Sequence, residues 1–156
     1  MKVIIDCDAC PRGALAASIK TAHEYGATAM TVADFSHEIE SDCHITVGKE
    51  SQAADIKIMN ITSRGDVVVT QDIGLAAAVM GKGARAIGVT GYEYLPERID
   101  AALEERAVKA KFRRAGGRTK GPAKRTKADD ERFAKTLSRI LAEESQSCPT
   151  ARESGD

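Results

Sequence analysis

Residues 2–11 read KVIIDCDACP, a β-branched apolar run that ends in two carboxylates, Asp6 and Asp8. Valine and isoleucine favour buried strands, and a proline soon afterwards favours a helix start, so the segment predicts a strand followed by a helix. Residues i and i+2 of an extended segment share a face, which would aim Asp6 and Asp8 at one point. Crowded carboxylates repel each other unless a cation or a shared proton relieves them. The segment therefore predicts a hard-metal site or an acid/base pair.

Outward from this segment, strands and helices alternate along the chain. We predict strands at residues 3–5, 27–33, 43–47, 67–70 and 84–89, and helices at 11–25, 51–65, 75–81 and 96–110. A last amphipathic helix carries Phe133, Leu137, Ile140 and Leu141 on one face. The alternation predicts an α/β fold, a three-layer sandwich with a mostly parallel central sheet, followed by a basic C-terminal segment and the final amphipathic helix.

Length and composition favour one globular domain. The chain has 156 residues, of which 42% are hydrophobic and 29% charged, as in ordinary globular proteins. It lacks both the run of about 18 apolar residues needed to span a bilayer and the core of a signal peptide. We therefore expect a cytoplasmic protein with no membrane contact. The four cysteines are then not expected to form a disulfide framework.

A second acidic strand end lies at residues 67–72, VVVTQD, where Asp72 follows a buried strand and opens a helix. If the two strands are neighbours, Asp6, Asp8 and Asp72 converge on one patch, which suits Mg²⁺ or Mn²⁺ because these ions prefer oxygen ligands. Asp55, in the first turn of a predicted helix, is a possible fourth ligand. The simpler interpretations are that Asp72 only caps its helix and that Asp55 only favours a helix N-terminus.

Cys7 and Cys10 form a C-x-x-C pair at a strand-to-helix junction, the setting of thioredoxin-like redox sites. Asp6 and Asp8 flank these thiols, and nearby negative charge disfavours the reactive thiolate. The Asp6-x-Asp8 pair also occurs in phosphatases with an aspartyl nucleophile, but Cys10 stands where that superfamily usually has Thr or Val. Redox and phosphatase functions are therefore secondary hypotheses.

The zero formal net charge hides a strong asymmetry. Residues 106–127 hold ten of the 23 Lys and Arg residues and no acidic residue. Clustered cations bind a nucleic-acid backbone through counterion release, without reading its sequence. The simpler interpretation is a solvated tail or one that pairs with the acidic body of the protein. The candidate nucleic-acid-binding residues are Arg113, Arg114, Arg118, Lys120, Lys124 and Arg125.

Four motifs together resemble the YaiI/YqxD family of uncharacterised bacterial proteins. They are DCDACP at residues 6–11, FSHE at 35–38, GDVVVTQDIGLAA at 65–77 and GPAKRT at 121–126. They occur in the family's order, and the resemblance covers about residues 2–142. The basic segment belongs to the family pattern, whereas Cys7 stands where alanine is usual, which lowers the redox hypothesis further.

The resemblance implies a relation to PIN-like domains, α/β sandwiches in which acidic side chains at strand ends bind divalent metal and cleave RNA. By this resemblance Asp6 and Asp72 match the acidic positions that end the first and a later central strand. Asp55 matches the acid between them, and Asp8 is the family's own addition. We expect a PIN-like domain at residues 1–110, a basic segment and helix packed on it at 111–144, and a disordered tail at 145–156.

The resulting prediction is a Mg²⁺- or Mn²⁺-dependent phosphodiesterase acting on RNA. Asp6, Asp8 and Asp72 would be catalytic, and the same residues together with Asp55 would hold the metal. The alternative from another class is a non-catalytic nucleic-acid-binding protein that keeps the fold, and a C-x-x-C thiol-disulfide protein comes third.

Overall fold

The structure is a computed structural model that describes residues 1–36, 38–50, 52–119 and 124–147. Its strands are β1 (Lys2–Asp6), β2 (Thr28–Asp34), β3 (Cys43–Val47), β4 (Val67–Val69) and β5 (Arg85–Ile87). Its helices are α1 (Arg12–Glu24), α2 (Ala53–Ile61), α3 (Ile73–Gly81), α4 (Pro96–Arg114) and α5 (Lys127–Ser147), and a 3₁₀ turn, η1 (Cys7–Ala9), follows β1.

The described strands form one parallel sheet in the order β3-β2-β1-β4-β5. From β1 the chain moves outward through β2 to β3, and it then returns to the other side of β1 to form β4 and β5. The strand order therefore reverses between β1 and β4. Ligands of open α/β sheets bind in the crevice outside the carboxyl ends of the strands at such a switch point.

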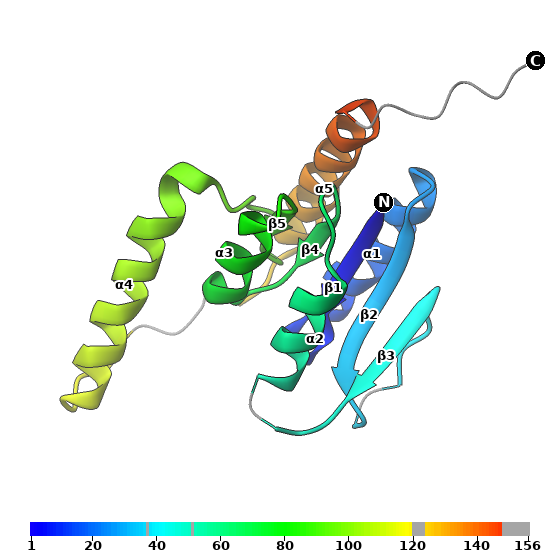
Figure 1. Ribbon diagram of the computed structural model, residues 1–156. Helices are drawn as coiled ribbons and strands as arrows, with labels where there is room; N and C mark the ends of the chain where they lie inside the picture. The colour runs from blue at the N-terminus through cyan, green and yellow to red at the C-terminus, as the bar shows by residue number, and fades with distance from the viewer. Residues whose placement is uncertain (37, 51, 120–123, 148–156) are drawn as a thin grey trace, which may run out of the picture.

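Helices cover both faces of the sheet, which confirms the predicted three-layer α/β sandwich (Figure 1). Alternate residues of β1 serve the two faces: Val3 and Ile5 belong to the core formed with α1 and α5, whereas Ile4 belongs to the core formed with α2 and α3. The predicted apolar face of α5 is fully buried in the first of these cores. The sheet is entirely parallel among the described residues, and we had predicted a mostly parallel one.

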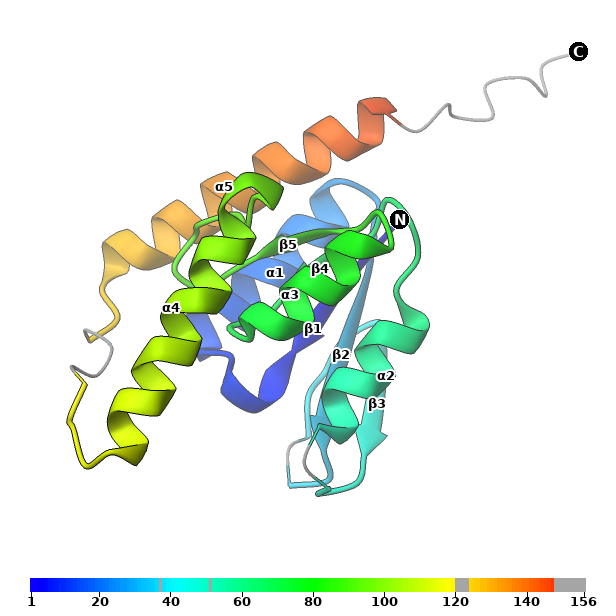
Figure 2. The same ribbon diagram turned by 60° about the vertical axis from the view of Figure 1, so that its left-hand side comes forward.

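Helix α4 is the exception to this layered packing. Among its residues none is buried, and its main helix contact is with α3. Figure 2 shows α4 beside the body of the protein, with its last turns extending toward the end at which the strands finish. No helix in the described part of the chain combines the length and the apolar character that a membrane span requires.

Several local details differ from the sequence-based expectation: α2 ends at Ile61 and not at residue 65, and β5 is shorter than the expected 84–89. Asp8 lies in η1 and not in an extended segment, because the chain turns directly after β1, with Cys10 N donating to Cys7 O at 3.3 Å. Helix α4 continues past residue 110 to Arg114, and Gly116 at φ +92° follows its end. Helix α5 includes residues 145–147 of the expected tail, while residues 148–156 and the expected cap Ser51 lie outside the described residues.

Candidate functional site

Asp6 is the last residue of β1, and its carboxylate is strongly perturbed by its surroundings. Thr70, directly after β4, donates from Oγ1 to Asp6 Oδ2 at 3.2 Å and so ties the ends of the two strands together. Burial raises the pKa of Asp6 to about 6, the Thr70 hydrogen bond acts in the opposite direction, and the charges of Asp55 and Asp8 raise the pKa further. The ionised form of Asp6 is therefore unfavourable in this environment.

Asp72 caps α3, as the simpler interpretation predicted, and it also has a cationic partner. Its Oδ1 accepts from Gly74 N at 2.8 Å and from Leu75 N at 3.4 Å, and Arg106 Nη1 of α4 donates to the same atom at 3.0 Å. Partial burial opposes ionisation, but these backbone N–H groups and the guanidinium outweigh it and lower the pKa of Asp72. Asp72 is thus a stable carboxylate, held by its own helix and by α4.

Asp55 lies in the first turn of α2, across from the ends of β1 and β4. Partial burial and the charge of Asp72 raise its pKa, Arg106 lowers it, and Asp8 raises it. The charges of Asp72 and Asp8 therefore both act on Asp55. A carboxylate that only stabilised the N-terminus of α2 would not need to lie near two other carboxylates. The four predicted ligands form one electrostatically connected group.

Two cavities open at this end of the sheet and share Asp55. The first has a volume of about 170 Å³, and its acidic lining residues are Asp6, Asp8, Asp34, Glu50 and Asp55. The second, of about 210 Å³, is lined by Asp55, Asp72 and Arg106, together with apolar side chains of α2 and α3. Asp8 is anchored at the first cavity because its Oδ1 accepts from the backbone N–H of Asp34 at 3.2 Å.

Asp6, Asp8, Asp34, Asp55 and Asp72 together form what we call the acidic edge. Their carboxylate oxygens fit the ligand preference of Mg²⁺ and Mn²⁺. Their present positions are less suitable: among the described residues, no three Asp, Glu, His or Cys side chains lie close enough together to hold a metal ion. Asp72 Oδ1 is already engaged by Arg106 and by two backbone N–H groups. The chemistry of the carboxylates therefore fits a divalent ion, but in the described residues the side chains are too far apart to bind one without moving.

The two thiols of the C-x-x-C pair lie beside the acidic edge, with Cys7 buried and Cys10 half-buried. Cys7 Sγ lies 3.5 Å from Ile5 O, and Cys10 Sγ lies 3.6 Å from Pro11 O. Burial raises the pKa of each thiol to about 12, and the charge of Asp6 adds to both. Thiol-disulfide exchange needs a thiolate, so these surroundings argue against redox chemistry.

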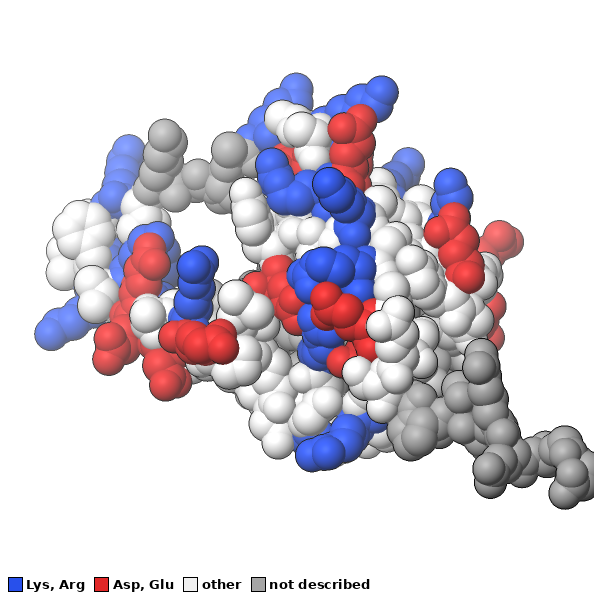
Figure 3. All heavy atoms as spheres, turned by 90° about the horizontal axis from the view of Figure 1, so that it is seen from above, with Lys and Arg blue, Asp and Glu red and all other residues white. Residues whose placement is uncertain are grey.

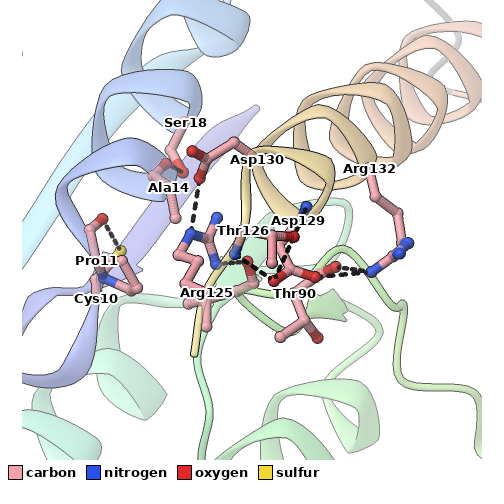
Figure 4. A network of polar contacts seen from close by, with 11 residues as sticks. Cys10, Pro11, Ala14, Ser18, Thr90, Arg125, Thr126, Asp129, Asp130 and Arg132 are labelled. Atoms are coloured by element: carbon pink, nitrogen blue, oxygen red, sulfur yellow. Dashed lines mark hydrogen bonds and ion pairs between the residues drawn. The ribbon is translucent and has the colours of Figure 1, made fainter. Parts of the chain in front are cut away.

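The predicted nucleic-acid-binding residues differ in their surroundings. Arg113, Arg114, Arg118 and Lys124 are exposed, and Lys120 lies outside the described residues. Arg125 faces inward instead: its Nε donates to Asp130 Oδ1 at 2.7 Å and its Nη1 to Val89 O (Figure 4). Arg125 therefore joins the start of α5 to the chain after β5, through Nε and Nη1, while its Nη2 is buried.

Arg106 and Asp34 were missed as site residues by the sequence reasoning. Asp34 ends β2 as Asp6 ends β1, so the same rule about acidic strand ends would have found it. Arg106 is the first residue of the basic run, but its pairing with Asp72 depends on how α4 lies against α3. No pattern in the sequence near Arg106 specifies that contact.

The amino end of the sheet has a different charge pattern. Figure 3 looks onto this end, and Lys and Arg side chains lie beside Asp and Glu over its middle. Arg85, at the start of β5, pairs with Glu93 at 2.7 Å and with Glu143 of α5 at 2.7 Å. Arg139 of α5 also pairs with Glu93, at 2.9 Å. These charges are matched, and they fasten α5 to the edge of the sheet.

Comparisons with known proteins give a consistent result. A family model described as uncharacterized BCR, YaiI/YqxD family, matches residues 4–143. A UPF0178 protein of Heliobacterium modesticaldum is 53% identical over 143 residues, covering 92% of this chain and 98% of the relative. A UPF0178 protein of Ruminiclostridium cellulolyticum is 42% identical over 148 residues, and the alignment covers 94% of this chain and 95% of the relative. No solved structure matches the chain. The predicted family is thereby confirmed, and the chain belongs to the YaiI/YqxD (UPF0178) family.

Proposed function

We propose that this protein is a Mg²⁺- or Mn²⁺-dependent phosphodiesterase that cleaves RNA. The observation that carries the proposal is the gathering of Asp6, Asp8, Asp55 and Asp72 around the switch point between β1 and β4. Their mutual repulsion contributes to the raised pKa values of Asp6 and Asp55. Such crowding is unfavourable in the apoprotein, and a bound cation would relieve it.

The four carboxylates are the residues that would hold the metal. A bound divalent ion supplies Lewis acidity and an activated water for attack on a phosphodiester. Asp6 and Asp8 would bind from the β1 side, and Asp55 from the start of α2. Asp72 would exchange its contact with Arg106 for one with the metal. Arg106 would then be released at the rim of the cavity, where a guanidinium suits a substrate phosphate.

The basic end of α4 supports RNA as the substrate. Arg114 lies eight residues after Arg106, or about 12 Å further along the helix. The exposed cations of this end, together with those of the segment after it, would attract a phosphate backbone toward the carboxylates. We assign backbone contacts to Arg113, Arg114, Arg118, Lys120 and Lys124, and a supporting role to Arg125.

A non-catalytic nucleic-acid-binding protein is the second candidate, and one observation favours it. Among the described residues no three potential ligands are close enough together to hold an ion. A binding protein would use the basic segment and would tolerate the loss of Asp6 or Asp72. The two candidates therefore differ in how they respond to changes at the acidic edge.

Cleavage and binding of a labelled single-stranded RNA, measured with EDTA, Mg²⁺ or Mn²⁺, separate the two candidates. Asp72→Asn should end metal-dependent cleavage but keep RNA binding, since asparagine still caps α3 and one negative charge is removed. Cleavage by this variant at the wild-type rate would refute the catalytic assignment. RNA binding by wild type in EDTA, kept by Asp72→Asn and without cleavage in Mg²⁺ or Mn²⁺, would favour the binding protein.

The basic segment is tested with the triple variant Arg113→Ala, Arg114→Ala, Arg118→Ala. Each lost phosphate contact should reduce the salt slope of single-strand binding by about 0.7. A matched control is Lys20→Ala with Lys135→Ala, which removes cations from the α1 and α5 side of the protein. Equal salt slopes for wild type and the triple variant would show that the segment does not bind RNA.

A further inference from the structure

An exposed aromatic side chain borders the acidic edge on the side away from α4. Phe35 directly follows Asp34, the last residue of β2, and 63% of its surface is exposed. The ammonium group of Lys49 lies over its ring, 4.6 Å from the centroid. A cation at this distance attracts the ring face and holds the two side chains together. The pair thus presents a positioned aromatic surface to solvent.

The Phe35–Lys49 pair adjoins the first cavity. Lys49 lines this cavity, as do Asp8 and Asp34. The backbone N–H of Asp34 donates to Asp8 Oδ1, which links the end of β2 to the turn after β1. Phe35 therefore directly follows a residue that lines the first cavity, on a segment that is hydrogen-bonded to Asp8 of the acidic edge. A group lying against the ring would be next to the carboxylates.

The basic end of α4 and the Phe35–Lys49 pair lie on opposite sides of the carboxylates. Figures 1 and 2 both show the last turns of α4 and the beginning of the β2–β3 connection at the end where the strands finish, separated across the sheet. Arg106 borders the second cavity and Lys49 the first, with Asp55 between them in both linings. An extended chain that contacts both sides must cross the acidic edge.

We propose that Phe35 and Lys49 form a subsite for one nucleotide of a single-stranded RNA, in which the base stacks on Phe35 and Lys49 contacts the adjacent phosphate. Stacking on aromatic side chains with flanking cations is the usual way of holding single strands. The inference rests on the proposed function for its substrate and adds a second, aromatic contact to the basic segment. The stacked base would hold the strand so that a neighbouring phosphate lies at the carboxylates.

The test is equilibrium binding of a fluorescein-labelled decauridylate in EDTA, so that neither metal loading nor cleavage affects the result. Phe35→Ala should weaken binding roughly 5- to 150-fold without changing the salt slope, because stacking releases no counterions. Lys49→Gln should reduce the slope by about 0.7. An abasic decamer of the same charge should bind wild type and Phe35→Ala equally, since it has no base to stack.

Phe35→Trp supplies an independent readout. The chain has no tryptophan, so this variant carries a single indole, whose fluorescence a stacked base should quench while the affinity stays near that of wild type. Tyr92 provides the matched control, because the residue is 64% exposed and its ring lies 4.9 Å from Arg132 Cζ, but it lines neither cavity. Tyr92→Ala should bind like wild type, and Tyr92→Trp should not be quenched.

Each outcome bears on the subsite. Equal affinity of Phe35→Ala and wild type for decauridylate, or no quenching in Phe35→Trp, would overturn it, and the proposed function would stand if wild type still bound and cleaved RNA. If wild type bound no RNA with or without metal, both the proposed function and the subsite would be refuted. Weaker binding by Phe35→Ala and by Tyr92→Ala alike would also refute the subsite, because the effect would not be local.

Discussion

Replacing Asp6 with asparagine removes a negative charge that burial makes unfavourable and keeps the shape of the side chain. The amide oxygen can still accept the hydrogen bond that Thr70 donates to Asp6. In the metal-free protein this substitution should therefore stabilise the fold at neutral pH. Most substitutions in the interior of a protein destabilise it, which makes this direction informative.

The size of the effect follows from the pKa of Asp6. That pKa is about 6 in the folded protein and 3.8 in the absence of the fold, so the folded state binds the proton more tightly. Stability is therefore lost as the pH rises from about 4 to about 6, and the full loss above that range is about 3 kcal/mol. Residual solvent contact reduces it, so we expect Asp6→Asn to gain about 1–3 kcal/mol at pH 7 and little at pH 4. For a chain of this length that is a rise of roughly 3–10 °C in Tm.

Urea denaturation followed by circular dichroism between pH 4 and pH 8, in EDTA, measures this difference directly. Asp100→Asn, which removes an exposed carboxylate from α4, is the matched control. Millimolar Mg²⁺ or Mn²⁺ should then raise the Tm of wild type by mass action but not that of Asp6→Asn. Three results would refute the reasoning: a stability difference that is the same at every pH, an asparagine variant less stable at pH 7, or a wild-type Tm that does not respond to metal.

Three further predictions concern other parts of the structure. Arg106→Ala should lower the Mn²⁺ concentration at which Tm begins to rise, because the guanidinium no longer competes for Asp72; an unchanged metal titration would contradict this. Cys7→Ala and Cys10→Ala should each retain RNA cleavage, and reduction of insulin disulfides by wild type but by neither variant would instead favour redox function. Arg85→Ala removes the more buried of the two arginines that pair with Glu93 and should lower the free energy of unfolding in urea by about 1–3 kcal/mol. A change below about 0.5 kcal/mol would mean that the ion pairs of Arg85 with Glu93 and Glu143 do not stabilise the protein.

Local patterns predicted most of the elements. The apolar runs at residues 3–5 and 67–69 are strands, and the 3.6-residue spacing of Phe133 and Leu137 marks a buried helix face. The end of α4 was misplaced because residues 111–114 were assigned to an irregular basic segment. Gly116, which takes a positive φ, was the better stop signal, since glycine adopts the left-handed conformation that often follows a helix.

The candidate site was only partly predictable. Asp6 and Asp72 were found because a carboxylate at the end of a buried strand is visible in the sequence. Contrary to our prediction, Asp8 does not share an extended face with Asp6, because it lies in η1; it nevertheless lines the same cavity as Asp6. Arg125 looked like one more exposed cation in a basic run, and only packing showed that it bonds to Asp130 and Val89.

The sequence by itself determined the alternation of strands and helices, the acidic residues at two strand ends and the concentration of positive charge in one segment. These features depend on residues close together in the sequence and on which side chains avoid water, and both are visible in the spacing of apolar and charged residues. The tertiary structure alone decided that β1 lies beside β4, that α4 brings Arg106 to Asp72 and that Phe35 lies beside Lys49. The apolar strands of a parallel sheet resemble one another, so their order depends on crossover connections and non-local packing that no single segment encodes.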